Sequence, residues 1–345
     1  VGPTKRDLAD KLIRRLREKI APGGFLHFGQ GKWYPGEQLP RWTFWLFWRR
    51  DGRPIWRDAA LIASESGNAG ATAEAAEQLL TTVARGLGVP GENVKPAFED
   101  PAVWLAKEAN LPENVTPANS KLADAEERYR IARVFDRGLN NPVGYVLPVQ
   151  RAQARAGGWR SEIWKTRRGA LMLVPGDSPA GYRLPLGALP YVPPKSYPYT
   201  YVADPTAIRG DLPDFAEAAR ERVREQPVTA VPGDTGAQQQ QVEQEISSDE
   251  NAIRTAITIE PRDGKLCVFI PPVERLEDYL ELLAVIEAAV TELGVPVHIE
   301  GYAPPHDPRI NVIRVAPDPG VIEVNIHPAA NWAECVATTE TIYEE

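Results

Sequence analysis

The segment that decides the fold of the C-terminal third is Pro317-Asp318-Pro319-Gly320-Val321-Ile322-Glu323-Val324-Asn325-Ile326-His327-Pro328. Its first four residues predict a turn, because proline presets φ and glycine accepts a positive φ. The flanking runs, 310–316 and 321–326, have strand composition, so a β-hairpin is expected. In the second run Glu323 and Asn325 share one face, with His327 next in register. This polar face is suited to the floor of an active site, and it is equally typical of a strand that faces solvent.

Upstream of this hairpin the pattern continues to alternate between strands and a helix. Residues 253–260 and 265–270 read as strands joined by a turn at Arg262-Asp263-Gly264, and 297–300 as another strand. Residues 276–293 have helical apolar spacing and end at Gly294. The order β-β-α-β-β-β over 252–345 predicts an α+β fold with a mainly antiparallel sheet and a helix on its apolar face.

The first 203 residues read as an aromatic-rich α+β region. Helices are expected at 4–20, 71–87, 100–110 and 123–138, and a strand at 144–149. Two hairpins are expected, one joining 42–50 to 53–57 through Asp51-Gly52, the other joining 159–166 to 170–174. Residues 204–251 are charged, Gln-rich and poor in large apolar side chains, as in a linker, an insertion or a disordered segment.

Composition narrows the class of protein. The chain has 345 residues and a formal net charge of −8, which argues against non-specific nucleic-acid binding. No apolar run is long enough to suggest a membrane span, and no signal peptide is evident. With only two cysteines, Cys267 and Cys335, neither a disulfide framework nor a structural zinc site is expected, and a reducing cytoplasmic setting is the default.

Three glutamates are the candidate metal ligands. Glu260, Glu300 and Glu323 each occupy the non-core side of a predicted strand. Clustered carboxylates repel one another unless a cation binds them, and oxygen ligands suit Mg²⁺ or Mn²⁺. Asn325 and His327 would then be neighbouring catalytic donors. The alternative is that the three glutamates only solvate an exposed sheet face.

Basic residues are the candidates for binding phosphate or an acyl substrate. Lys32 follows the turn Gly29-Gln30-Gly31, whose N–H groups have the composition of an anion cradle, although a tight turn between strands explains it as well. Arg41 and Arg183 complete the set. Five tryptophans lie between positions 33 and 56 and serve either core packing or ligand contact. Neither a GxSxG nor an HExxH motif is present.

Long motifs resemble a known family. The segments 27–37, 175–179 with 182–186, and 317–328 are similar to the amidoligase module found C-terminal to transglutaminase-like domains in large bacterial proteins. That module is assigned to the carboxylate–amine ligase superfamily of glutamine synthetase and glutamate–cysteine ligase. The resemblance implies an antiparallel sheet with glutamates that hold Mg²⁺, and ATP-dependent formation of an acyl phosphate that an amine attacks.

The resemblance also implies how the chain is used. Its partners would be a transglutaminase-like domain in the same polypeptide and a peptide or amino-acid substrate. The family continues beyond Glu345, so the sequence is expected to be a truncated module that is inactive alone. Two alternatives stay open: a non-catalytic module that binds a peptide or glycan through the aromatic patch, and a hydrolase that uses a carboxylate pair.

Overall fold

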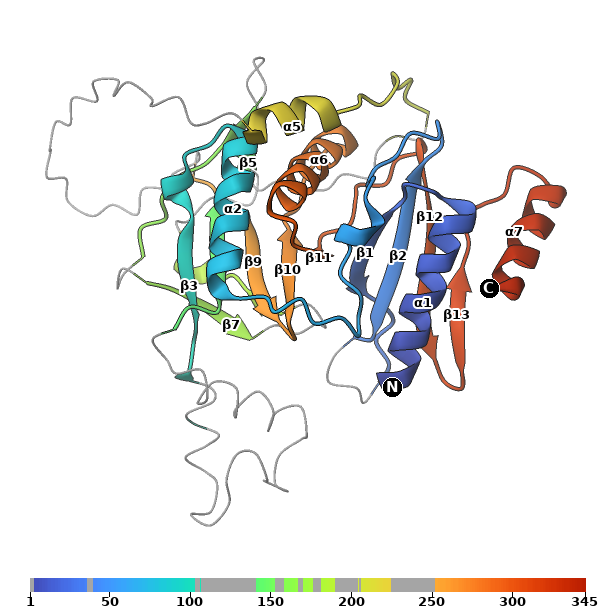
Figure 1. The fold of residues 1–345 in the computed structure, drawn as a ribbon, viewed down its shortest axis with the longest axis horizontal. Coiled ribbons are helices and arrows are strands. Elements are labelled where there is room, and N and C mark those ends of the chain that lie inside the picture. The colour runs from blue at the N-terminus through green and yellow to red at the C-terminus, as the bar shows by residue number, and fades with distance from the viewer. Residues whose placement is uncertain are drawn as a thin grey trace, which may run out of the picture.

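The computed structural model describes residues 3–35, 40–102, 106, 141–152, 158–166, 170–175, 181–189, 204, 206–224 and 252–345. Its centre is an eleven-stranded, mostly antiparallel sheet with the order β13-β12-β2-β1-β11-β10-β9-β4-β3-β7-β8, flanked by helices (Figure 1). The predicted α+β class is confirmed. The strands of this sheet are β1 (Phe25–Gln30), β2 (Trp42–Arg49), β3 (Lys95–Glu99), β4 (Gly144–Pro148), β7 (Leu171–Pro175), β8 (Tyr182–Arg183), β9 (Ala256–Arg262), β10 (Lys265–Ile270), β11 (Val297–Gly301), β12 (Ile310–Asp318) and β13 (Val321–Asn325).

The remaining elements are mainly helices. They are α1 (Pro3–Ile20), α2 (Ala73–Leu87), α5 (Ala216–Arg224), α6 (Leu276–Leu293) and α7 (Trp332–Glu344), with 3-10 turns η1 (Ala59–Leu61), η2 (Gly91–Asn93) and η4 (Leu186–Ala188). A separate two-stranded sheet pairs β5 (Gln150–Arg151) with β6 (Trp159–Arg160).

The predicted regions 1–203 and 252–345 contribute strands to the same sheet. β1 and β2 lie between β11 and β12, so the N-terminal strands separate two C-terminal ones. β11 runs parallel to both β1 and β10, and β3 runs parallel to β7, while the other pairs are antiparallel. Strands from both ends of the chain therefore alternate within this part of the sheet.

The C-terminal secondary structure follows the sequence pattern. β9, β10, α6, β11, β12 and β13 occur in the predicted β-β-α-β-β-β order. The hairpin of β12 and β13 closes through Pro319-Gly320, with Asp318 paired to Val321 and Gly320 at φ +77. Proline followed by a residue with positive φ is the signature of a type II turn. Gly294 ends α6 in the left-handed conformation at φ +65.

Both predicted N-terminal hairpins are wrong in their pairing. β2 pairs with β1 on one side and β12 on the other, so neither edge is open to residues 53–57, where Pro54 also lacks an N–H. β7 pairs with β3 and β8, and β6 pairs with β5. The helices predicted at 100–110 and 123–138 lie almost entirely outside the described residues.

One helix occupies part of the predicted linker 204–251. In α5, Ala216, Ala219 and Val223 are buried and the helix packs against α2 and α6. Small apolar residues at helical spacing explain this contact. Residues 225–251 lie outside the described part of the chain.

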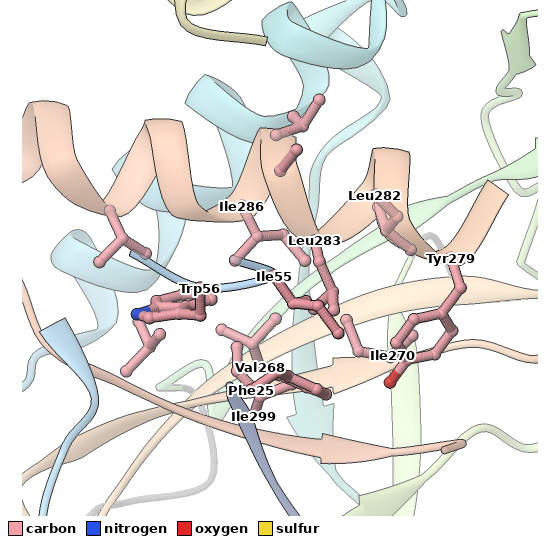
Figure 2. Packing of buried hydrophobic residues seen from close by; sticks show 14 of the residues in the cluster. Phe25, Ile55, Trp56, Val268, Ile270, Tyr279, Leu282, Leu283, Ile286 and Ile299 are labelled. Carbon is pink, nitrogen blue, oxygen red and sulfur yellow. The ribbon is translucent and has the colours of Figure 1, made fainter. Parts of the chain in front are cut away.

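The two faces of the sheet carry different helices. On the face that we call the α6 face, α6 packs Tyr279 and Leu283 toward Phe25, Val268 and Ile299 (Figure 2). Helix α1 packs on the opposite face, the α1 face, where it contacts β2 and β12 and Arg6 lies over the ring of Phe44. The apolar side of a strand thus differs between the two halves of the sheet.

Candidate functional site

Two of the three predicted metal ligands meet on the α1 face. Glu260 on β9 and Glu300 on β11 flank β10, where Cys267 pairs with Glu260 and Phe269 pairs with Glu300. Both glutamates are buried, with relative exposures of 4% and 3%. Carboxylates this deep require charge compensation, because an unpaired buried charge is strongly unfavourable.

Arg262 supplies that compensation. Its Nη1 donates to Glu260 Oε1 and, at 3.2 Å, to Glu300 Oε1, while its Nη2 donates to Glu300 Oε2. Burial alone lowers the pKa of Arg262, but the adjacent Glu300 and Glu260 contribute to a net pKa well above its usual range. One guanidinium against two carboxylates leaves the trio with one net negative charge.

Gly181, which has no side chain, lies directly against this trio. A Cβ placed on Gly181 would lie 1.6 Å from Glu260 Oε1 and 2.3 Å from Arg262 Nη1, so only glycine permits the approach. Two residues later, Arg183 places its Cζ 5.3 Å from the ring centroid of Phe269. The predicted substrate-binding Arg183 is therefore brought to the same face as Glu260 and Glu300.

A second, partly buried ionic group adjoins the trio. Glu65 pairs with Arg6, with 2.7 Å between Oε2 and Nε, and its Oε1 lies 3.5 Å from His298 Nε2. Burial, with a further contribution from Arg262, lowers the pKa of His298 well below its usual value, so this imidazole is neutral at pH 7. Lys265 donates to the Glu65 carbonyl at 2.8 Å. The α1 face is therefore polar at its centre, between two apolar flanks.

Cys267 lies between these groups but is not a nucleophile. It is 1% exposed, and burial raises its thiol pKa above the usual range. The thiolate is the reactive form, so a buried neutral thiol is inert.

Glu323 lies apart from the other two glutamates. Paired residues on neighbouring strands share a face, and the pairs Glu323–Ala316, Arg314–Trp45 and Trp45–His27 place Glu323 on the face of His27. Phe28, the next residue, shares the opposite face with Glu300. Four strand spacings also separate β13 from β11, about 19 Å along the sheet. The three carboxylates do not converge.

The residues predicted around Glu323 form their own group at the sheet edge. Lys32 Nζ donates to Glu323 Oε2, and Asn325 Nδ2 donates to Glu323 Oε1 at 2.9 Å. These hydrogen bonds, from Lys32 first and then Asn325, lower the pKa of Glu323. Nearby, Arg41 stacks on Tyr34 with its Cζ 4.1 Å from the ring centroid, and Tyr34 donates to Asp318.

The predicted anion cradle at Gly29-Gln30-Gly31 does not form a nest of free N–H groups. Gly31 N donates to the Arg41 carbonyl and Arg41 N donates to the Lys32 carbonyl, which extends the pairing of β1 with β2. Gly29 and Gln30 are the last residues of β1, so the segment is neither an anion cradle nor a tight turn.

His327 is buried between Trp48 and Glu334. It is 8% exposed, its ring meets Trp48 edge-on at 5.0 Å, and its Nε2 lies 3.4 Å from Glu334 Oε1. Glu334 also accepts from Ala330 N, while Asn331 caps the first turn of α7. His327 therefore fixes the start of α7.

Most of the aromatic patch is used in packing. Trp56 is fully buried, Trp42 stacks on Phe44 at 4.8 Å, and Trp48 packs on the core. Trp33 is the exposed member, at 69%. The alternative of an aromatic recognition surface thus retains few candidate residues.

Arg262 is the site residue that the sequence interpretation missed. The sequence pattern predicts a turn at Arg262-Asp263-Gly264, whereas Arg262 is the last residue of β9 and, two residues from Glu260, shares its face. The two-residue spacing between Glu260 and Arg262 is the sequence signal that indicates this pairing.

The described part of the chain shows no group of three or more His, Cys, Asp or Glu side chains arranged for a metal ion. None of its helices is both long and apolar enough to cross a bilayer. A family model described as "Putative amidoligase enzyme (DUF2126)" matches residues 1–345. No curated protein and no solved structure shows significant similarity to the chain.

Proposed function

The chain belongs to the DUF2126 family of putative amidoligase enzymes, and we propose that it provides the metal- and phosphate-binding centre of an ATP- and Mg²⁺-dependent carboxylate–amine ligase. The observation that carries this proposal is the buried pair Glu260 and Glu300, held together by Arg262. The substrate class is a peptide or amino-acid carboxylate, and the neighbouring partner is a transglutaminase-like domain.

The donor set fits a magnesium ion that shares its ligands with a nucleotide. Mg²⁺ is usually held by one or two carboxylates together with water and substrate phosphates, so a third protein carboxylate is not required. Glu260 and Glu300 would hold the ion, which would neutralise phosphate charge when bound. Glu323, on the other face, is not one of its ligands in this proposal.

Arg262 and Arg183 have complementary roles in this proposal. Arg262 offsets one of the two carboxylate charges and thereby helps to keep the pair buried in the absence of a metal ion. A planar guanidinium also binds phosphate or carboxylate oxygens in a bidentate manner, which suits Arg183, on the same face, to the acyl substrate or the nucleotide. Closure by the Gly181 segment keeps water away from the reacting groups.

ADP release by the full-length protein tests this proposal. The assay would vary carboxylate and amine substrates and require Mg²⁺. We expect Glu260→Gln and Glu300→Gln each to lower kcat/KM by about 100-fold or more, because loss of a metal ligand removes several kcal/mol of charge stabilisation. The control is Glu340→Gln, an exposed glutamate on α7. Activity that needs no ATP, or that survives both site variants, would contradict the proposal.

A further inference from the structure

A pocket of about 320 Å³ opens at one end of the α1 face. Its walls come from Arg14 on α1, from the segment that begins at η1, from Lys265 at the start of β10 and from Pro296, just before β11. Lys265 pairs with Arg262 on β9, so the pocket lies beside the Glu260–Arg262–Glu300 trio. Small molecules bind in pockets of about 300–1,000 Å³, so this one can hold a small ligand.

Lys265 is a buried cation that lacks a carboxylate partner among the described residues. It is 7% exposed, and its Nζ donates to the Glu65 carbonyl at 2.8 Å. The Glu65 carboxylate is itself paired with Arg6, with 2.7 Å between Oε2 and Nε. An ammonium group has three N–H donors, so two remain on Lys265. A buried charge is strongly unfavourable unless an opposite charge compensates it, so this ammonium indicates a missing anion.

Arg14 brings a second cation to the same pocket. Its Nε donates to Asp10 at 3.0 Å, and Asp10 is buried and lies outside the described lining. Its Nη1 donates to the Ile62 carbonyl at 3.2 Å and its Nη2 to the Ala63 carbonyl at 2.7 Å. A guanidinium has five N–H donors, so these bonds fix its orientation and leave two N–H groups for a ligand.

The segment from η1 to α2 is held in place without a ligand. Ala63 N donates to the Val297 carbonyl at 2.8 Å, which ties this segment to the start of β11. Ala69 N donates to the Gly264 carbonyl at 2.9 Å, which ties it to the turn between β9 and β10. A pocket with fixed walls loses little conformational entropy on binding, so weak polar contacts can suffice.

The chemistry of the lining favours an organic anion that carries no ammonium group. The described lining includes Arg14 and Lys265 but no Asp or Glu. The oxygens of a carboxylate or phosphate can accept from both cations, whereas an ammonium group on the ligand would find no acidic partner. Ala60, Ile62 and Pro296 add an apolar wall suited to a short hydrocarbon body.

We propose that Arg14 and Lys265 form the anion-binding end of a small-molecule site between α1 and the start of β10. Its ligand is a carboxylate or phosphate ester with a short apolar body and no cationic group. The described lining contains none of Glu260, Arg262 and Glu300, and binding here requires neither ATP nor Mg²⁺. The site therefore goes beyond the proposed ligase centre, and either proposal can fail without the other.

Thermal unfolding of the chain with three probes, at constant ionic strength, tests this site. We expect propionate or methyl phosphate to raise the melting temperature in a saturable manner, because a ligand that binds only the folded chain stabilises it. A response to propionate alone identifies a carboxylate site, and a response to methyl phosphate alone identifies a phosphate-ester site. If propionate binds, L-alanine, which is propionate with an added ammonium group, should bind about tenfold more weakly or less.

Two variants and one control decide the assignment. Lys265→Met removes the ammonium group, and Ala60→Leu fills the pocket without a change of charge, so each should weaken the apparent affinity about tenfold or more. Lys165→Met is the matched control, because Lys165 is exposed and lies outside the described lining. No saturable response to propionate or methyl phosphate, equal affinity for propionate and L-alanine, or wild-type affinity in both site variants would overturn the proposal.

Discussion

Glu300 and Glu323 lie on opposite faces of one sheet, although both occupy alternating positions of C-terminal strands. Glu300 is buried beside Glu260, and both are bound by Arg262, whereas Glu323 is paired with Lys32 at the sheet edge. The arrangement gives two separate polar groups, one around Arg262 and one around Glu323. We predict different effects of substitution at each.

Arg262→Met should destabilise the fold strongly. The substitution leaves two buried carboxylates without a cation, and breaking a buried pair in this way costs about 3–5 kcal/mol in the free energy of unfolding. Urea unfolding at pH 7 measures the loss, and added Mg²⁺ should recover part of it. Arg275→Gln is the control, since its exposed pair with Glu277 at 3.7 Å contributes at most about 1 kcal/mol. Equal effects of the two substitutions would contradict the assignment.

Two glycine substitutions should differ sharply. In Gly181→Ala the new Cβ collides with the Glu260 carboxylate, so we expect about 1–3 kcal/mol of destabilisation, as in overpacked interiors. In Gly187→Ala the Cβ meets nothing within 4 Å, and the loss of unfolded-state entropy should leave stability unchanged or slightly higher. Thermal unfolding of the two variants compares them. Identical melting temperatures would show that the Gly181 segment does not close over Glu260.

His27 should make stability depend on pH. Burial, opposed in part by the Gly301 backbone, lowers its pKa to about 4 from 6.5. Between these values the unfolded chain binds a proton that the folded chain does not, so stability falls as pH falls. The loss from pH 7 to pH 5 is about 2 kcal/mol from this group. Urea unfolding at the two pH values should show a smaller loss in His27→Phe than in wild type.

The matched control for this comparison is the exposed His306. His306→Ala should keep the wild-type difference in unfolding free energy between pH 7 and pH 5. If His27→Phe also kept it, the buried imidazole would not be neutral in the folded state.

Glu323→Gln should have little effect on stability. Its ion pair with Lys32 is partly exposed, with side-chain exposures of 25% and 52%, and such pairs contribute at most about 1 kcal/mol. Urea unfolding at pH 7 measures the change, with Glu340→Gln as the exposed reference. A loss above about 2 kcal/mol would show that the edge group is a structural centre.

Local features of the fold could be predicted because they depend on neighbouring residues. Pro319-Gly320 specifies its turn, Gly294 ends α6, and the alternation of Val321–Asn325 gives the strand. The position of β1 and β2 between β11 and β12 depends on pairings more than 200 residues apart, for which no local pattern exists. The parallel pairing of β1 with β11 is the clearest example.

The same reason explains why the sequence pattern wrongly groups Glu323 with Glu260 and Glu300. Alternation fixes which residues share a face within a strand but not between strands. Ile299 packs under α6, whereas Ile313 lies on the face that α1 covers, so the apolar side changes across the sheet. Glu300 and Glu323 both oppose apolar neighbours and still point in opposite directions. Arg183 and Glu260 lie on the same face of the sheet, but only the tertiary structure could show this placement.

Titration with Mn²⁺, followed by the electron paramagnetic resonance signal of the free ion, tests the metal-binding centre most directly. The account predicts a saturable site in the wild-type chain that Glu260→Gln and Glu300→Gln each weaken at least tenfold, while Glu323→Gln and Glu340→Gln retain it. Binding that is lost in Glu323→Gln and unchanged in Glu260→Gln and Glu300→Gln would contradict it.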